Sequence, residues 1–418
     1  MRTLILLVLL AATAVAHADQ PGLEPAILLR PARVFDGTTT HTGWRVLVQG
    51  NRIVAAGSEV PAAEARTIDF PEATLIPGLI EGHSHLFLHP YDEADWDEQV
   101  LHESIALRTV RAVDAARATL MAGFTTVRDL GTEGAGFADV GLKQAIDEGI
   151  IPGPRMLVAT RAIVATGAYG PKGFEPGVEV PQGAEEASGE DIVRAVRRQI
   201  AAGADVVKLY ADYSWRPGES RRPTMSEAEL RAATAAAHDA GRTVAVHATT
   251  EEGMRRAIAA GVDTIEHGYG GTKEIFRAMK DRGIALCPTL AAVASVARYK
   301  GWDERDPVPA AVELARSAFK AALAAKVTIC AGSDVGVFAH GANVLELELM
   351  QDAGMPAREV LVAATSGNAR AFHIDDRVGA IRAGLIADLV VVANDPSTNI
   401  RALRQIRMVM KDGKVVRE

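Results

Sequence analysis

Eight short apolar runs alternate with longer stretches of helical periodicity between Thr74 and His373, and this alternation constrains the fold more than any other feature. The runs read TLIPGLIEGHSH, TTVRDL, RMLVAT, DVVKLY, TVAVHA, TIEHG, IALCPT and TICAGSD. Eight strands separated by helices are typical of a (β/α)8 TIM barrel, an α/β fold. Barrels of this kind place their sites at the carboxyl ends of the strands, so the polar residues that end these runs are candidates for function.

The segments between the apolar runs carry recognisable helix boundaries. Ser226 and Glu229 match a capping box at the start of SEAELRAATAAAHDA, and Gly241 follows the end of that stretch. Residues 167–189 are different, because they are rich in Gly and Pro and are longer than an ordinary loop. We expect this segment, which follows the third run, to be a lid or a loop facing the substrate.

Short β segments occur at both ends of the chain, outside the predicted barrel. One lies between about residues 27 and 70, with a tight turn at Gly50-Asn51, and the other near the C-terminus has a turn at Asp412-Gly413. We predict that residues 19–72 and 374–418 together form a small β-sandwich domain and that residues 73–373 form the barrel. Closing such a long insertion is tolerable because loop entropy grows slowly with length.

The first eighteen residues resemble a signal peptide. Arg2 precedes an apolar run from Leu4 to Ala16, and Ala16-His17-Ala18 places small residues where signal peptidase cleaves. The run is shorter than the roughly 20 residues that a membrane span needs. We therefore expect cleavage after Ala18 and an exported protein, periplasmic or secreted, with no membrane segment in its mature form.

The chain has two cysteines, Cys287 and Cys330, and each lies in an apolar run. Although export would permit a disulfide, cysteines in such runs are usually small buried side chains. We expect these two to be core residues that are not bonded to each other.

The composition excludes several classes of protein. With 48% hydrophobic residues the chain is neither disordered nor collagen-like, and its net charge of −8 provides no excess of cations for sequence-independent binding to nucleic acid. A small molecule is the expected partner, and self-association into a homo-oligomer remains open.

Six metal-ligand or ionisable side chains fall at or near the ends of the predicted strands. They are His83, His85, Lys208, His247, His267 and Asp334. His83 and His85 are two residues apart, so on one strand both imidazoles face the same side and can chelate one ion. Each residue also has an ordinary interpretation: a histidine ending a strand, an ion pair, or a helix cap at Asp334. Their joint register favours a metal centre.

Lys208 is the least ordinary of the six because it lies inside the apolar run DVVKLY. A buried charged lysine carries a large desolvation cost, so one alternative is that its amine reaches solvent or pairs with an acid. The other is that the neutral amine captures carbon dioxide, and the resulting carbamate bridges two cations.

Several longer stretches resemble the amidohydrolase superfamily, specifically its imidazolonepropionase and prolidase-related branch. They are PGLIEGHSH, TTVRDLG, GADVVKLY, AHDAGRTVAVHATTEEGMRRAIAAGVDTIEHG, AGSDVGVFAHGANVLELELM and VGAIRAGLIADLVVV. Together these stretches cover almost the whole chain after the predicted signal peptide.

The resemblance implies a role for each of the six residues. His83 and His85 would bind the more buried ion together with Asp334, His247 and His267 would bind the second ion, and carbamylated Lys208 would bridge the two. The implied ions are two divalent metals, most often Zn²⁺, and a hydroxide shared between them would attack the carbonyl of an amide-type C–N bond. Asp334 would take the proton of that hydroxide and pass it to the departing amine.

Other residues are weaker candidates. Arg128 and Asp129 are expected to pair and orient the ligands, with a plain ion pair inside the barrel as the alternative. Possible substrate contacts are Tyr169, Tyr210, Tyr213, Arg222 and His340, the last also as an anchor for its own loop.

Two departures from peptide-cleaving relatives limit the assignment of a substrate. Those relatives carry a His in a TGGH-like stretch and a Tyr after the fifth strand, both of which hold the substrate carboxylate. This chain has Thr166-Gly167-Ala168-Tyr169 and Thr249 at those places. A carboxylate would then need another anchor, with Arg161, Lys172 and Arg222 as the candidates.

Three functions follow from this reading. The first is hydrolysis of a dipeptide or an N-acyl amino acid, and the second is hydrolysis of a cyclic amide, imidazolone or lactone at the same metals. The third, from a different class, is a metal-stabilised binding protein without activity, against which the presence of Asp334 argues.

Overall fold

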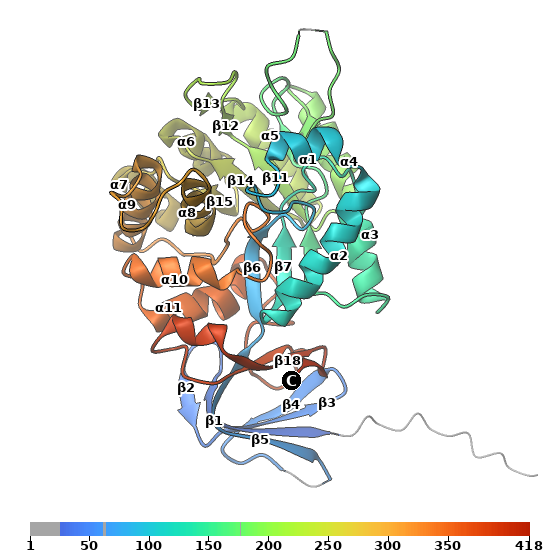
Figure 1. The fold of residues 1–418 in the computed structure, drawn as a ribbon, viewed down its shortest axis with the longest axis vertical. Coiled ribbons are helices and arrows are strands. Elements are labelled where there is room, and N and C mark those ends of the chain that lie inside the picture. The colour runs from blue at the N-terminus through green and yellow to red at the C-terminus, as the bar shows by residue number, and fades with distance from the viewer. Residues whose placement is uncertain (1–25, 62–63, 176) are drawn as a thin grey trace, which may run out of the picture.

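The computed structural model describes residues 26–61, 64–175 and 177–418. The predicted signal peptide therefore lies outside the described residues. Figure 1 shows two parts, a small β-sheet domain in which blue and red segments meet, and a larger α/β part above it. Within the described residues, no helix combines the length and hydropathy that a membrane crossing requires.

The small domain is built on one sheet with strands from both ends of the chain. The strands are β1 (Ile27–Phe35), β2 (Thr40–Thr42), β3 (Arg45–Gln49), β4 (Arg52–Gly57), β5 (Arg66–Pro77), β17 (Leu389–Val392), β18 (Ile406–Lys411) and β19 (Lys414–Arg417). Their order is β19-β18-β17-β5-β1-β3-β4, with β2 paired to β1. The two ends of the chain meet where β17 runs antiparallel to β5, and Leu29, Leu75 and Leu389 are buried beside that junction.

Both predicted turns of this domain are two-residue hairpins. Gly50 and Asn51 connect Gln49 to its partner Arg52, and Asp412 and Gly413 connect the paired residues Lys411 and Lys414. Asp412 and Gly413 both have positive φ, at 49° and 75°. Asp-Gly is favoured in such turns because Gly has no steric cost there and Asp tolerates the left-handed region.

The larger part is the predicted TIM barrel. Its strands are β6 (Leu79–Ser84), β7 (Phe124–Asp129), β8 (Arg155–Val158) with β9 (Ile163–Val164), β11 (Val206–Tyr210), β14 (Thr243–Ala248), β15 (Thr264–His267) and β16 (Ala285–Cys287). Neighbouring strands are parallel. The eighth position is taken by residues 328–335, which bridge to β16 at Leu286–Ile329 and to β6 at Ser84–Val335.

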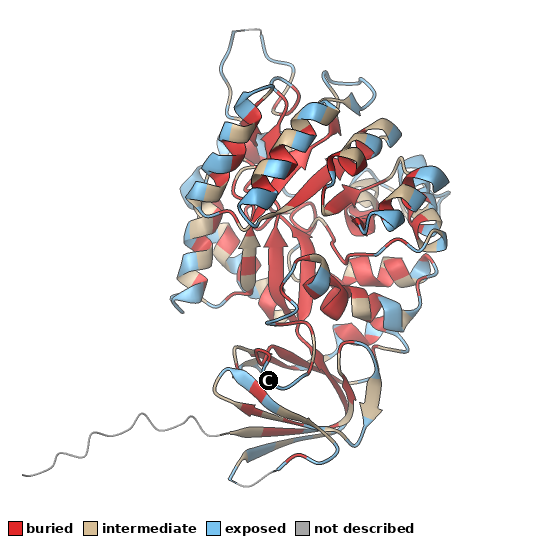
Figure 2. Ribbon diagram, turned by 180° about the vertical axis from the view of Figure 1, so that it is seen from behind, coloured by how far each residue is buried: buried red, intermediate tan, exposed pale blue. Residues whose placement is uncertain are grey.

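Helices surround these strands. They are α1 (Trp96–His102), α2 (Ile105–Met121), α3 (Ala138–Asp147), α4 (Asp191–Ala202), α5 (Glu227–Asp239), α6 (Glu251–Ala260), α7 (Lys273–Asp281), α8 (Leu290–Tyr299), α9 (Ala310–Ala324), α10 (Val344–Asp352), α11 (Ala357–Val362) and α12 (Asn368–Ala371). In Figure 2 the strands are mostly buried, and the helices turn exposed residues outward. The predicted capping box of Ser226 and Glu229 is present at the start of α5.

Short elements complete the chain. They are β10 (Glu185–Glu186), β12 (Asp212–Tyr213), β13 (Arg222–Pro223), a π-helical turn (Ala363–Gly367) and a 3-10 turn (Ile400–Arg404). The hairpin of β12 and β13 follows β11, and the loop with residues 167–175 and 177–184 follows β9. Figure 1 shows both at the end of the barrel away from the sheet domain.

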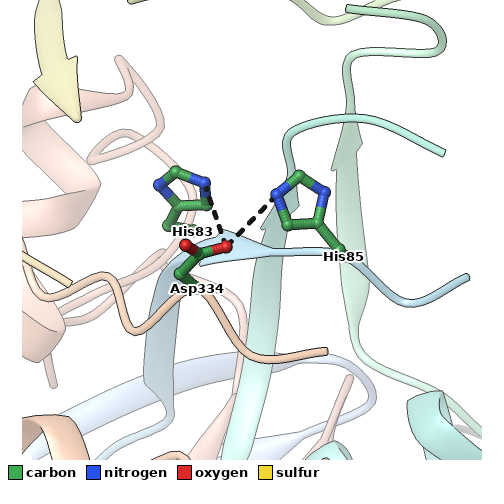
Figure 3. A group of neighbouring side chains, drawn as sticks. All are labelled: His83, His85 and Asp334. Atoms are coloured by element: carbon green, nitrogen blue, oxygen red, sulfur yellow. Dashed lines mark ion pairs between the residues drawn. The ribbon is translucent and has the colours of Figure 1, made fainter. Parts of the chain in front are cut away.

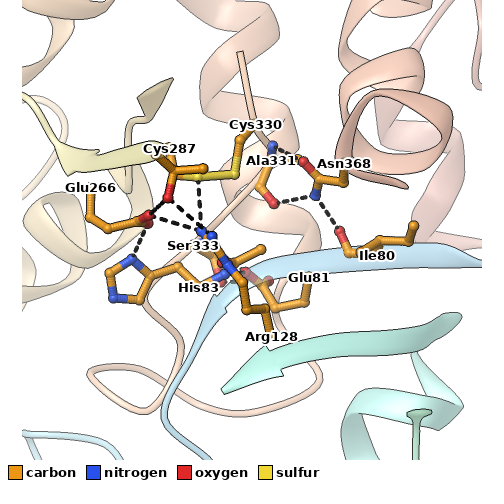
Figure 4. The surroundings of a disulfide bond; sticks show 12 residues. Ile80, Glu81, His83, Arg128, Glu266, Cys287, Cys330, Ala331, Ser333 and Asn368 are labelled. Atoms are coloured by element: carbon orange, nitrogen blue, oxygen red, sulfur yellow. Dashed lines mark hydrogen bonds and ion pairs between the residues drawn. A yellow bond between two sulfur atoms is a disulfide. The ribbon is translucent and has the colours of Figure 1, made fainter. Parts of the chain in front are cut away.

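The prediction for the two cysteines is wrong in part. Both are buried as expected, but Cys287 and Cys330 form a disulfide with a Cα–Cα distance of 4.6 Å (Figure 4). The cause is the register of the seventh and eighth strands, in which Leu286 bridges to Ile329 and thereby places the next residue of each strand side by side. Only the pairing of these strands brings the two sulfur atoms together.

Candidate active site

Three side chains predicted to bind metal form a close group at the barrel rim. His83 and His85 come from the end of β6, and Asp334 follows the eighth strand (Figure 3). Asp334 Oδ1 lies 3.6 Å from His83 Nε2 and 3.4 Å from His85 Nε2. One ligand atom from each residue falls within 4.8 Å of the others. Alternate residues of a strand share a face, so the spacing of two directs both rings to this point.

The other three predicted ligands lie next to this group. Lys208 Nζ, on β11, is 3.3 Å from His83 Nε2. The ring of His267 lies 5.3 Å from that of His83, and the ring of His247 lies 4.4 Å from that of His267, measured between centroids. The structure therefore brings all six residues together from β6, β11, β14, β15 and the eighth strand.

Three of the predicted histidine ligands bond to supporting residues through Nδ1. Nδ1 of His83 bonds to Glu266, Nδ1 of His85 bonds to the carbonyl of Gly131, and Nδ1 of His267 bonds to Thr289. In each case Nε2 is left to face the group. Fixing one ring nitrogen with a carboxylate, a carbonyl or a hydroxyl is how proteins orient histidines that bind metals.

Burial favours the uncharged form of several of these groups. It lowers the pKa of His83 to about 4 and lowers the pKa of Lys208. Burial also opposes a charge on His85, but the hydrogen bond with Asp334 and the charge of Glu133 raise the pKa of His85 to about 9. The neutral imidazole of His83 and the uncharged amine of Lys208 are the forms that metal binding and carbamate formation require.

Two of the predicted ligands have a left-handed backbone. His267 has a φ of 72° and Asp334 a φ of 61°. Residues other than glycine seldom adopt this conformation, and when they do they cluster at functional sites, where the surrounding structure holds them in place. Here the turn occurs where each strand ends, which is where a side chain must leave the strand direction to reach the metal group.

A buried acid that the sequence analysis missed supports His83. Glu266 Oε2 is 2.8 Å from His83 Nδ1, and Glu266 Oε1 accepts a hydrogen bond of 2.8 Å from Arg128. Arg128 also donates to the carbonyl of Gly82 at 2.7 Å. The Arg128 charge, despite burial, lowers the pKa of Glu266. Glu266 precedes the ligand His267 in TIEHG, and this adjacency was the available signal.

The predicted pair of Arg128 with Asp129 is not present among the described residues. Arg128 pairs with Glu266 instead, and Asp129 Oδ2 accepts the backbone N–H of Leu86 at 2.9 Å. Consecutive residues on a strand point to opposite faces, which explains why these two side chains separate. Both residues still support predicted ligands. Arg128 bonds to Glu266, which bonds to His83, and Asp129 bonds to the backbone of Leu86, the residue after His85.

A second missed acid joins the first and last barrel strands. Glu81 accepts hydrogen bonds from the backbone of His83 at 3.0 Å, from the backbone and hydroxyl of Ser333 at 2.8 and 2.7 Å, and from Asn343 at 2.8 Å. Burial raises the pKa of Glu81. The signal for it was a glutamate inside the otherwise apolar PGLIEGHSH.

A cavity of about 770 Å³ opens onto His83, His85 and Asp334. Three of the predicted substrate contacts, Tyr169, Tyr210 and Tyr213, line it, and the ring of Tyr210 stacks on His247 at 4.5 Å. The hydroxyl of Tyr169 donates to Glu133 at 2.5 Å. Missed members of the lining include Tyr91, Glu133, Arg221 and Tyr269.

The other predicted substrate contacts lie elsewhere. Arg222 is exposed on β13 and does not line the cavity, whereas its neighbour Arg221 does. His340 also lies outside the lining, and its Nε2 bonds to the carbonyl of Leu88 at 3.0 Å, which anchors its own loop.

The two other candidates for a carboxylate anchor already bond to backbone carbonyls. Arg161 donates to the carbonyl of Ala184 at 3.0 Å, and Lys172 donates to the carbonyls of Ala168 and Ser214. Thr249, which stands where relatives have Tyr, bonds to Asp212 through both its backbone N–H and its hydroxyl.

Comparison with known proteins identifies a family. Residues 74–416, most of the chain, match the amidohydrolase family. The match begins just before β6 and continues into β19, so it includes every barrel strand that carries a predicted ligand.

Individual relatives are similar over most of their length. A protein of Mycobacterium tuberculosis without an assigned function is 29% identical over 368 residues, which are 85% of this chain and 89% of the relative. Ochratoxinase of Aspergillus niger is 26% identical over 410 residues, with 88% and 82% covered. The crystal structure of a Xaa-Pro dipeptidase with methionine bound in its active site superposes with a TM-score of 0.84 at 29% identity, over 94% of this chain and all of that one.

Proposed function

The chain belongs to the amidohydrolase family, and from this premise we propose that it is an exported hydrolase that cleaves the amide bond of a dipeptide or an N-acyl amino acid. We further propose that it works with two divalent metal ions, most often Zn²⁺, and with a carbamate on Lys208. The convergence of His83, His85, Lys208, His247, His267 and Asp334 on one rim of the barrel carries the proposal.

The proposed ligands divide into two sets. His83, His85 and Asp334 would hold one ion, His247 and His267 would hold the other, and the carbamate of Lys208 would serve both. When bound, such ions lower the pKa of water to near neutrality and polarise a carbonyl group. Burial of Lys208, with 1% of its surface exposed, disfavours the ammonium form and so favours the neutral amine that reacts with carbon dioxide.

Asp334 is proposed to move the proton. Its side chain is 16% exposed, while the adjacent His83 and His85 are exposed by 5% or less, so of these three it reaches furthest toward the cavity. Burial opposes a charge on Asp334, but the interactions with His83 and His85 outweigh it and lower the pKa of Asp334, so the group is an ionised carboxylate. It would receive a proton from the attacking water and deliver it to the departing amine.

The substrate class draws support from two relatives. One is named an ochratoxinase and the other a Xaa-Pro dipeptidase. The cavity of about 770 Å³ lies within the roughly 300–1,000 Å³ typical of small-molecule sites. This volume suits a dipeptide or an acylated amino acid.

The test combines metal analysis with a hydrolysis screen on the chain from Asp19 onward. We expect two divalent ions per chain and turnover of acyl-amino acids or dipeptides. The panel also contains lactones, lactams and an imidazolone, because the same metal ligands would serve those substrates. Turnover of the cyclic compounds alone would reject the proposal that the substrate is a linear amide. Tight metal binding without turnover of any compound would reject the proposal that the protein is an enzyme.

Export has its own measurement. Expression of the full chain in a bacterium with an outer membrane, followed by fractionation and N-terminal sequencing, should yield a periplasmic protein that begins at Asp19. A cytoplasmic protein that retains Met1 would reject this part of the proposal.

A further inference from the structure

The cavity wall contains a guanidinium group that the metal ligands do not use. Arg221 lies on the connection between β12 and β13, beyond the carboxyl end of β11, and lines the cavity beside Tyr213 and His247. Among the described residues, no side chain forms a hydrogen bond or an ion pair with it. An arginine kept free at a cavity wall is available to a ligand, and a planar guanidinium suits a carboxylate in particular.

Arg221 shares the cavity lining with Tyr213 and with the proposed ligand His247. Burial raises the pKa of Tyr213, and the charge of Arg221 opposes this rise. Because Arg221 and His247 line the same cavity, one bound molecule can contact both.

Another side of the cavity is mostly apolar, with Lys300 as its one basic residue among the described lining residues. It is formed by α8, the start of α9 and the segment between them, with Val293, Val296, Ala297, Trp302, Pro309 and Leu314 in its lining. Leu314 is 54% exposed although it is a large aliphatic residue. In the barrel this wall follows β16, whereas Arg221 follows β11, so β14 and β15 lie between the two surfaces.

We propose that Arg221 binds the carboxylate of the amino acid that leaves, while the wall formed by α8 and α9 holds a bulky apolar acyl group. This inference rests on the proposed function, because it assigns the two ends of the proposed amide. The substrate class is then an amide between a large apolar acid and the amino group of an amino acid. Arg221 takes the place of the carboxylate anchor that Thr249 and residues 166–169 do not provide.

The test compares two substrates that differ only at the carboxylate. An amino acid acylated with a large aromatic acid is assayed as the free acid and as its C-terminal carboxamide. Hydrogen bonds to charged groups contribute about 1.5–3 kcal/mol, so Arg221→Met should raise KM for the free acid by about 10- to 100-fold. For the carboxamide, Arg221→Met should change kcat/KM by less than about twofold, because an uncharged carboxamide interacts only weakly with the guanidinium.

Arg222→Met is the matched control. Arg222 is the next residue and, like Arg221, is exposed, but it lies outside the cavity lining. Its replacement should therefore leave KM and kcat/KM unchanged for both substrates. A second variant, Lys300→Met, removes a cation that lines the cavity beside the apolar wall, after the end of α8. If Lys300→Met rather than Arg221→Met removes the preference for the free acid, the assignment to Arg221 is wrong.

The apolar wall is tested with a series of acyl groups on one amino acid. We expect kcat/KM to rise from acetyl through hexanoyl to an aromatic acyl group in the wild type, and Val296→Asp to flatten this rise. A preference for acetyl would overturn the assignment of the wall. If the wild type hydrolyses none of these amides in either form, the proposed function fails; if it hydrolyses acid and carboxamide equally, only the inference fails.

Discussion

At the scale of single residues, the site combines groups that would be costly to bury separately. His83 and Lys208 are each 1% exposed, and their nitrogen atoms lie 3.3 Å apart, yet burial disfavours the charged form of both. Two neutral nitrogen groups can share this space, whereas two cations would repel each other. Asp334 supplies the negative charge beside them.

Replacing Asp334 tests the role of proton carrier. Asp334→Asn keeps the shape and one oxygen ligand but removes the group that accepts a proton, so we expect bound metal to be retained and kcat to fall by about 10²- to 10⁴-fold. Metal content and steady-state kinetics measure the two effects. Asp376→Asn, at a side chain that is 80% exposed, is the control. Near-normal turnover in Asp334→Asn would exclude the role.

Lys208 allows a test that does not depend on turnover. The mass of the intact native protein should exceed the mass of the chain and its bound ions by one carbon dioxide. Lys208→Met should lose this increment together with one or both ions. Lys280→Met, on α7 with the lysine 52% exposed, should keep both. Two tightly bound ions in Lys208→Met would show that the lysine does not bridge.

At the scale of secondary-structure elements, one buried network connects three strands behind the ligands. Arg128 on β7 bonds to Glu266 on β15 and to the carbonyl of Gly82 on β6. The same Glu266 bonds to His83, so the position of a ligand on the first strand depends on an arginine from the second and an acid from the sixth. Glu81 and Ser333 make the corresponding connection between the first and last strands.

Breaking this network should cost stability and metal affinity together. Arg128→Met leaves the buried carboxylate of Glu266 without its cation, which typically destabilises a protein by about 3–5 kcal/mol. Urea unfolding measures the loss, and metal titration should show a weaker site. The double variant Arg128→Met/Glu266→Gln should recover part of the stability, since it removes the unpaired charge. A single variant as stable as the wild type would contradict the described pairing.

At the scale of the whole molecule, the barrel also depends on a buried acid outside the six proposed ligands. Glu346 on α10 is buried, and its Oε2 accepts the backbone N–H of Ala291 at 2.6 Å, which connects α10 to the start of α8. Burial raises the pKa of Glu346 to about 8. The folded protein thus keeps a proton on this carboxyl that the unfolded chain releases at a lower pH.

This difference predicts a pH dependence of stability. The unfolded carboxyl has a pKa of about 4.3, so the stabilisation is fully present below that pH and is lost as the pH rises toward 8. Glu346→Gln removes this titration and should flatten the decrease of the urea midpoint between pH 5 and about pH 8.5. An unchanged pH profile in the variant would show that Glu346 does not carry the effect.

Local patterns were sufficient for the strands, the capping box of Ser226 and the two hairpin turns, because each depends on residues close together in the chain. The six proposed ligands also followed from local position, since each ends or lies on an apolar run. The same reasoning failed for Arg128 and Asp129, whose adjacency in sequence suggested a contact that the alternation of a strand prevents.

The sequence by itself determined the order of the strands and helices. It also determined the rim of the barrel on which the polar side chains lie. The partners across strands were decided only in the tertiary structure: Glu266 with His83, Cys287 with Cys330, and Arg221 rather than Arg222 at the cavity. The physical reason is that register and loop path depend on the packing of the whole barrel. A shift of one residue between strands, or one residue along a loop, changes which side chains meet.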